Sequence, residues 1–185
     1  MSTINFSPFP VLDTARLTLR RALPSDAADL LEMRSDPTVM QYIPRPLATC
    51  EEDVRDLINM IDGFIESNER INWAIEWKAT GKVLGLIGYV NIKPPHYRAE
   101  VGYSLTRAWH RRGIMREALS AVIQYGFADM KLHSIEAIID AENDASGKLL
   151  EDAGFVREAF FREDFFHNGR FRNSIHYGLL QPDPA

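Results

Sequence analysis

The sequence predicts an α/β protein in which helices flank a mixed, mostly antiparallel β-sheet. Three observations carry this prediction. Strand-like runs surround a single β-α-β-α unit between residues 99 and 153. A helical repeat of apolar residues follows residue 50, and Asn168-Gly169 separates two further strand-like runs, which is a strong signal for a β-hairpin. With 185 residues and no internal repeat or long linker, we expect one domain over 1–185 with its core at about 15–180.

The elements of the first half follow from periodicity and end signals. Residues 16–21 alternate as a strand, and a helix is expected from Ser25 or Asp26 to Arg34, ending before Pro37. The proline-containing segment Thr38–Ala48 is expected to be a loop. Thr49 and Glu52 match a capping box. The helix behind this box repeats apolar residues at helical spacing, namely Val54, Leu57, Ile58, Ile61 and Ile65.

In the second half of the chain, apolar residues first recur at every second position, as in a strand, and no longer at helical spacing. Thr80-Gly81 connects two alternating runs into a hairpin, and Pro94-Pro95 ends it. Asn143 is a suitable N-cap, and Gly154 with Phe155 fits a Schellman end. The expected elements are strands at 72–77, 83–92, 99–106, 135–139, 158–166 and 170–180, and helices that open near 112 and span 143–153. The predicted order is therefore β-α-α-β-β-β-α-β-α-β-β.

Composition limits the classes of function. The net charge is −5, which argues against non-specific nucleic-acid binding. Cys50 is the only cysteine and has no histidine nearby in sequence, so we expect neither a disulfide nor a catalytic thiol. The five histidines lack metal-ligand spacing, so no metal is expected. Residues 1–10 do not resemble a signal peptide and no apolar run has membrane-spanning length, which makes the cytoplasm the expected location.

Three arginines lie at the start of the helix that opens near residue 112. Arg111, Arg112 and Arg116 put positive charge where the helix dipole is already positive, which costs about 0.3–1 kcal/mol for each cation. An anion held by the free N–H groups of the first turn would reverse this cost, and Gly113 would let it approach closely. The pattern indicates a phosphate cradle. A solvated basic turn, partly offset by Glu117, is the alternative.

Two further places could carry chemistry. Ser146 follows Asn143 by three residues and would lie on the first exposed edge of its helix, although both residues could simply be capping groups. Glu100 lies within an apolar strand, on one face with Gly102 and Ser104, and is a candidate proton acceptor. A solvated glutamate at the sheet edge is the alternative there. The phenylalanines between 155 and 171 are expected to pack in the core and the hairpin, with some available for an acceptor pocket or a dimer contact.

Taken together, these segments resemble the GNAT superfamily of acetyl-CoA-dependent N-acetyltransferases. The specific matches are Ala99–Tyr103, Trp109–Ala118, and Asn143-x-x-Ser146 leading into Leu150–Phe155. The nearest branch is that of the ribosomal-protein-alanine N-terminal acetyltransferases (Rim-type), and the resemblance runs from Thr14 to Leu180. It implies a splayed sheet. His110 and Met115 depart from the family pattern Gln/Arg-x-x-Gly-x-Gly/Ala, but the contacts expected there are made by the main chain.

The resemblance also implies roles for the candidate residues. The turn His110, Arg111, Arg112, Gly113, Ile114, Met115 and Arg116 would wrap the pyrophosphate of acetyl-CoA. The strand residues Tyr103, Ser104 and Leu105 would pair with its pantetheine arm, and Asn143 would contact the pantetheine amides. Ser146 would also contact the cofactor and would hydrogen-bond or protonate the departing thiolate. Glu100 would take the proton of the attacking amine.

These features predict direct transfer of an acetyl group from acetyl-CoA to a primary amine. The expected acceptor is a protein N-terminal α-amine such as that of a ribosomal protein, because such an amine is neutral roughly a tenth of the time at pH 7 and asks little of a base. The alternatives are a small amine (a polyamine, an aminoglycoside or a metabolite) and a binding module that holds acyl-CoA without transferring it. No nucleic acid or membrane partner is expected, and a homodimer is possible.

Overall fold

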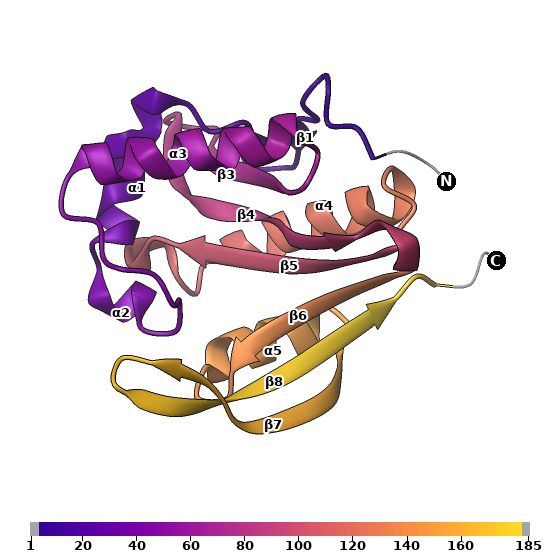
Figure 1. Cartoon of the computed structure of the whole chain (residues 1–185). Coiled ribbons are helices and arrows are strands. Elements are labelled where there is room, and N and C mark those ends of the chain that lie inside the picture. The colour runs from indigo at the N-terminus through magenta and orange to yellow at the C-terminus, as the bar shows by residue number, and fades with distance from the viewer. Residues whose placement is uncertain (1–3, 183–185) are drawn as a thin grey trace.

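Eight strands form one sheet in the order β1-β2-β3-β4-β5-β6-β8-β7, shown in Figure 1. The computed structural model describes residues 4–182. Neighbouring strands are antiparallel except for β5 and β6, which run parallel. The strands are β1 (Leu12–Asp13), β2 (Leu17–Arg20), β3 (Ile71–Trp77), β4 (Lys82–Lys93), β5 (Arg98–Leu105), β6 (Ser134–Asp140), β7 (Val156–His167) and β8 (Arg170–Leu180). The helices are α1 (Ala27–Arg34), α2 (Pro37–Met40), α3 (Glu51–Glu66), α4 (Ile114–Ala128) and α5 (Asp144–Asp152), with short 3₁₀ turns η1 (Pro24–Asp26), η2 (Pro94–His96) and η3 (Arg107–Trp109).

The predicted fold class and the order of the long elements are confirmed. Among the strands and α-helices of residues 4–182, two short ones were not expected: the strand β1, and the one-turn helix α2 at the start of the segment expected to be a loop. Asp36 explains α2, because its carboxylate accepts the backbone N–H of Thr38 at 2.7 Å and caps the turn. The Met1–Pro10 segment, in which no signal peptide was expected, begins with three residues outside the described part of the chain.

The predicted capping box of α3 is wrong in register. The helix begins at Glu51, after Cys50 as N-cap, so the third helical residue is Asp53 and not Glu52. The Asp53 carboxylate accepts the backbone N–H groups of Thr49 and Cys50 and the Thr49 hydroxyl. A shorter acidic side chain one residue later therefore closes the helix end.

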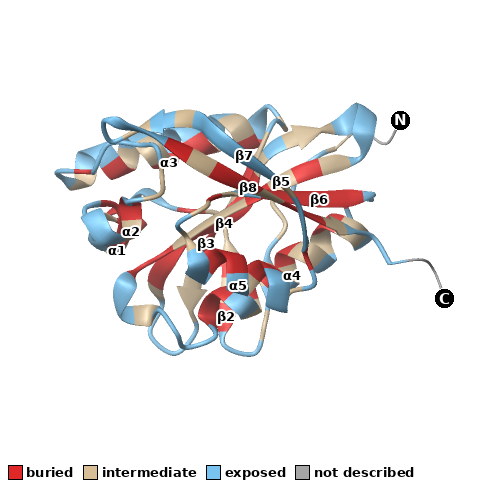
Figure 2. Ribbon diagram, turned by 90° about the horizontal axis from the view of Figure 1, so that it is seen from below, coloured by how far each residue is buried: buried red, intermediate tan, exposed pale blue. Residues whose placement is uncertain are grey.

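The predicted ends of the last elements are confirmed. Asn143 caps α5, and the N–H groups of Gly154 and Phe155 bond to Glu151 and Leu150 in a Schellman end. Asn168 and Gly169 both have positive φ, as a type I′ hairpin turn requires. Of the phenylalanines expected to pack in the core and the hairpin, Phe155 is buried, whereas Phe160, Phe161, Phe166 and Phe171 are exposed on the hairpin. Figure 2 shows the exposed β7 beside the buried central strands.

Helices cover the two faces of the sheet unequally. In Figure 1, α1 and α3 lie on one face over β3 and β4, and α4 and α5 lie on the other. Trp73 and Tyr89 point toward α4, where the Tyr89 hydroxyl donates to the Val122 carbonyl at 2.9 Å and Trp73 meets Tyr125 edge-on. The α1 and α3 layer stops at β4, so on that face β6, β8 and β7 carry no helix (Figure 1).

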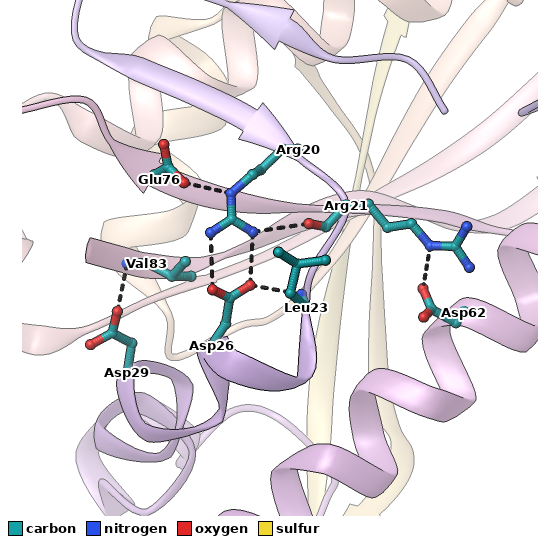
Figure 3. Close-up of polar contacts among 8 residues, drawn as sticks. All are labelled: Arg20, Arg21, Leu23, Asp26, Asp29, Asp62, Glu76 and Val83. Atoms are coloured by element: carbon teal, nitrogen blue, oxygen red, sulfur yellow. Dashed lines mark hydrogen bonds and ion pairs between the residues drawn. The ribbon is translucent and has the colours of Figure 1, made fainter. Parts of the chain in front are cut away.

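A polar network fixes η1 and α1 to the sheet (Figure 3). The Arg20 guanidinium binds both oxygens of Asp26, at 2.8 and 2.9 Å, and also Glu76 on the neighbouring strand. Asp29 in α1 accepts the N–H of Val83 at 2.9 Å, and Arg21 reaches Asp62 in α3 at 2.8 Å. Because Asp26 is buried, this bidentate pairing compensates a charge that would otherwise be costly inside the protein.

The sheet splits between β5 and β6. These strands pair only from Arg98 to Glu100 with Ser134 to Glu136. Beyond that point β5 stays paired with β4 up to Leu105, and β6 stays paired with β8 up to Asp140. The two halves of the sheet therefore diverge as a wedge, which Figure 1 shows opening toward α2. The splayed sheet implied by the family resemblance is present.

The packing of α4 against Tyr89 yields a test of the core. A Cβ at Gly126 would lie 2.1 Å from the Tyr89 hydroxyl, so we expect Gly126→Ala to lower the free energy of unfolding by about 1–3 kcal/mol through overpacking. Gly63 in α3 has open space around the same position, so Gly63→Ala should raise it by about 0.5–1 kcal/mol through helix propensity. Urea denaturation of both variants measures these changes. Equal effects of the two substitutions would contradict the close packing of Tyr89.

Candidate active site

The start of α4 forms a turn with outward-facing backbone donors. Gly113 is the N-cap with φ +73°, and Arg111 also has a positive φ of +59°. No backbone N–H from Arg112 to Arg116 donates to another group within residues 4–182, whereas Glu117 N–H bonds to the Gly113 carbonyl. These donors at the positive end of a helix dipole are suited to bind an anion.

The three arginines of this turn carry charge that no acidic residue among 4–182 pairs with. None of Arg111, Arg112 and Arg116 forms an ion pair within the described chain, and all three are exposed. Glu117 does not offset them, because Arg16 binds its carboxylate at 2.7 Å and the Thr14 hydroxyl donates to it at 2.6 Å. Although partial burial would raise the pKa of Glu117, these hydrogen bonds hold it below its ordinary value. The cationic charge therefore remains available to a ligand.

Aromatic side chains pack against the turn. The Arg112 guanidinium lies 5.0 Å from the Trp109 ring centre, and Trp109 packs on Trp77 at 5.1 Å. Arg16 donates to the Arg112 carbonyl at 3.1 Å. The His110 ring, through Nε2, bonds to the Leu105 carbonyl at 2.8 Å and so ties the turn to the end of β5. These contacts hold Arg112 and the backbone of the turn in a defined position.

The inner edge of β5 has no strand partner where the wedge opens. Tyr103, Ser104 and Leu105 pair on one side with Ile87, Leu86 and Gly85 of β4, and the side toward β6 is unpaired. Backbone groups on such an edge need hydrogen-bond partners from water or from a ligand. This edge leads directly to the His110–Arg116 turn, so the two predicted parts of the cofactor site lie together.

Ser146 occupies the expected third position of α5, and Asn143 accepts its N–H at 3.2 Å through Oδ1. The expectation that Ser146 is exposed is wrong: the residue is only 8% exposed. Tyr103 explains this, because it reaches from β5 and places its hydroxyl 2.6 Å from Ser146 Oγ. Burial raises the pKa of Tyr103 to about 12, so the phenol stays protonated near neutral pH.

Glu100 lies where the pairing of β5 and β6 ends, directly beside Glu136. It forms no ion pair within residues 4–182. Burial raises the pKa of its carboxyl and Glu136 adds to this shift, whereas Asn91, Lys93 and His176 oppose it. Glu136 is paired with Lys93 at 2.6 Å and with Arg98 at 2.9 Å. Of these two neighbouring carboxylates, Glu100 is thus the one whose charge is not compensated.

A second set of residues lies at the open end of the wedge and was not predicted. Arg172 is buried against Asp140, and the Tyr42 ring, from the segment after α2, lies 5.5 Å from its guanidinium. The Tyr42 hydroxyl donates to the Glu142 carbonyl at 3.0 Å. The segment after α2 is therefore attached to the opposite half of the sheet. Nothing in the sequence marks these pairs, because strand register and a crossing loop bring them together.

The described residues hold no group of three or more His, Cys, Asp or Glu side chains placed to bind a metal ion. None of the helices within 4–182 is long and apolar enough to cross a membrane.

Comparison with known proteins identifies this arrangement. Residues 16–156 match the model of the acetyltransferase (GNAT) domain. The chain is 34% identical to the uncharacterized N-acetyltransferase p20 of Bacillus licheniformis over 94% of its own length and 98% of that protein's. It is 27% identical to the [ribosomal protein uS5]-alanine N-acetyltransferase of Escherichia coli over 68% of this chain and 66% of that one.

A solved structure agrees with these matches. Spermidine N-acetyltransferase from Vibrio cholerae, in complex with CoA and spermine, superposes with a TM-score of 0.79 and 25% identity, over 91% of this chain and 97% of that one. The family match covers the wedge, the arginine turn and α5. The chain belongs to the GNAT acetyltransferase family and is an acetyl-CoA-dependent N-acetyltransferase.

Proposed function

We propose that this N-acetyltransferase acts on a protein N-terminal α-amine, such as that of a ribosomal protein. The observation that carries the proposal is the face of β6, β8 and β7 that carries no helix within residues 4–182 and is bordered by α2 and the β7–β8 hairpin (Figure 1). Glu100 belongs to this face at the vertex of the wedge. A face without a covering helix leaves an approach for an extended peptide, whereas a small amine must be enclosed on all sides.

For the donor substrate, the turn from His110 to Met115, with Arg116, would hold the pyrophosphate by main-chain donors and guanidinium groups. The free edge of Tyr103, Ser104 and Leu105 would pair with the amide-containing pantetheine arm, and Asn143 would contact the same arm. Bound acetyl-CoA supplies the activated acetyl group. The protein orients it toward the acceptor, and this orientation provides much of the rate acceleration.

On the acceptor side, two carboxylates near the open end are already engaged. Asp140 is paired with Arg172, and Glu142 with both Arg170 and Arg172. This leaves Glu100 to accept one proton from one amine, directly or through water. An α-amine needs little help, since about a tenth of it is neutral at pH 7, whereas a lysine amine is neutral only about once in several thousand.

A polyamine is the second candidate acceptor, because a similar structure was solved with spermine. A polycation would require several free carboxylates around the site. The pairing of Asp140 and Glu142 with arginines favours the single α-amine. An acyl-CoA-binding module that transfers nothing would have no use for Glu100.

The donor site is tested by removing its charge. We expect the triple variant Arg111→Gln, Arg112→Gln and Arg116→Gln to bind CoA about tenfold or more weakly in calorimetry. The free protein should become more stable by about 1–3 kcal/mol, because three cations leave the positive end of the helix.

Arg162→Gln is the control, since Arg162 is exposed on β7 and forms no ion pair within 4–182. It should change neither quantity. Unchanged CoA affinity in the triple variant would reject this turn as the pyrophosphate site.

The acceptor is tested with a panel incubated with isotope-labelled acetyl-CoA and read by mass spectrometry. We expect label on the α-amine of peptides with free N-termini, including those that begin with alanine or serine. Peptides with a blocked N-terminus and an internal lysine should remain unlabelled. Labelling of spermidine with no labelling of any peptide would replace the proposed acceptor by a polyamine.

The raised pKa of Glu100 predicts a specific pH dependence. As a base it must be ionised, so kcat/KM should fall as the pH drops through its raised pKa, which lies above the ordinary value of 4.5. Glu100→Gln should lower kcat/KM by about 10²-fold at pH 8 and abolish this fall at low pH.

The raised pKa of Glu100 also affects stability, because folding favours the protonated form of its carboxyl. The protonated carboxyl stabilises the fold fully below the pKa that Glu100 has in the unfolded chain, and this stabilisation is lost as the pH rises through its pKa in the folded protein. The glutamine variant should therefore unfold at a higher temperature than the parent protein at pH 8, with the difference vanishing near pH 4.

Glu136→Gln is a matched control, for which we expect the opposite change in stability at pH 8. Burial opposes ionisation of Glu136, but hydrogen bonds from Lys93 and Arg98 lower its pKa overall. Its contribution to stability is present above the unfolded pKa and is lost as the pH falls through the folded pKa, so this variant should be less stable than the parent protein at pH 8. If both variants shift the melting temperature in the same direction, the assignment of Glu100 as the uncompensated carboxylate is wrong.

A further inference from the structure

The two arms of the wedge are joined by one short contact between hydroxyl groups. Tyr103 belongs to the part of β5 that has left β6, and Ser146 belongs to the first turn of α5, which follows β6. Their oxygens lie 2.6 Å apart, and both side chains are on the face of the sheet that carries α4 and α5. A strand side chain thus determines the surroundings of a residue on the other arm.

The direction of this hydrogen bond follows from the acidity of the two groups. A phenol is a much stronger acid than an aliphatic alcohol, so the favoured arrangement has the Tyr103 hydroxyl donating to Ser146 Oγ. The raised pKa of Tyr103 means that it keeps its proton and remains a donor. Because a hydroxyl has a single proton, Ser146 can then direct its own O–H at another acceptor.

We infer that Tyr103 is a positioning residue for acetyl transfer, because its hydroxyl holds Ser146 Oγ and leaves the Ser146 proton free for the sulfur of the departing thiol. This inference rests on the proposed acetyl transfer and on the role toward the departing thiolate that the family resemblance implies for Ser146. The amine nitrogen forms a bond to the acetyl carbon and loses one proton, by way of Glu100, to solvent. The C–S bond breaks, its electron pair goes to sulfur, and sulfur takes the Ser146 proton. The serine oxygen, held by Tyr103, takes a proton from water in the same step, so that no serine alkoxide forms and charges and atoms balance.

Kinetics should separate this role from a purely structural one, in which Tyr103 only holds the two arms of the wedge together. We expect Ser146→Ala to lower kcat about 10²-fold, as loss of a general acid does. Tyr103→Phe should lower kcat about tenfold, the effect of one lost hydrogen bond. Neither variant should change the CoA dissociation constant in calorimetry by more than about twofold, because both keep the backbone groups that would bind the pantetheine arm and lose only a hydroxyl that acts as the thiolate departs. The double variant should be no slower than Ser146→Ala alone, since residues that act as a unit are not additive.

The leaving group provides a second kinetic readout. A selenol is a stronger acid than a thiol, so its anion departs without needing a proton. With acetyl-seleno-CoA as donor, Tyr103→Phe should recover to nearly the rate of the parent enzyme. If Tyr103 had only a structural role, Tyr103→Phe would lower kcat by the same factor with acetyl-CoA and with acetyl-seleno-CoA.

A measurement on the free protein tests the contact without turnover. With ¹³Cζ-labelled tyrosine, the NMR signal that Tyr103→Phe removes should shift in Ser146→Ala, because the phenol loses its acceptor. Tyr177→Phe is the matched control: its hydroxyl donates to Glu151 in α5 at 3.0 Å, and its loss should leave kcat and the Tyr103 signal unchanged.

The outcomes are distinguishable. A parent protein that neither binds CoA nor acetylates any amine would overturn the proposed function. A parent protein that acetylates, together with a Tyr103→Phe variant of full kcat or with an equal deficit for both donors, would overturn only the role of Tyr103. Additive losses in the double variant would also overturn it.

Discussion

The divergence of β5 from β6 is the constraint on which the site depends. Each strand keeps its outer partner, β4 or β8, and they share only three register positions before separating. The strand edge exposed in this way carries peptide groups that need hydrogen-bond partners. A substrate with its own amide groups would complete that edge, which is why we propose this break in the sheet as a binding surface. The turn at the start of α4 and the first turn of α5 are positioned by the two strands that diverge.

The positive charge at the start of α4 is a second feature of the free protein that a ligand would compensate. Arg111, Arg112 and Arg116 weaken the free helix, while the carboxylate of Glu117 in its first turn is held by Arg16 and Thr14. A diphosphate would relieve this repulsion, so binding free energy is gained partly by removing a cost that the free protein carries. Ligand binding to the folded state alone also stabilises the fold, which couples occupancy to stability.

Three sets of contacts keep the two arms of the wedge in register. Lys93 and Arg98 hold Glu136 at the closed end, Tyr103 meets Ser146 on the α5 face, and Tyr42 reaches the Arg172 and Glu142 region at the open end. The contacts at the two ends are charged or lie against a charged group. The middle one joins two neutral hydroxyls, which makes it the one suited to directing a proton.

Local sequence chemistry was sufficient to predict the long elements, the α5 caps, the Asn168-Gly169 hairpin and the position of the arginine turn at a helix start. Each of these features depends on residues that lie within a few positions of one another in the sequence. The register of the α3 cap was missed because Asp53 competes with Glu52 for the same donors, and propensity does not rank them. The burial of Ser146, the Tyr42 and Arg172 contact, and the contrast between Glu100 and Glu136 were decided only by tertiary structure. Each depends on strand pairing that joins residues 32 or more positions apart, such as Asp140 with Arg172, and periodicity along the chain carries no information about that register.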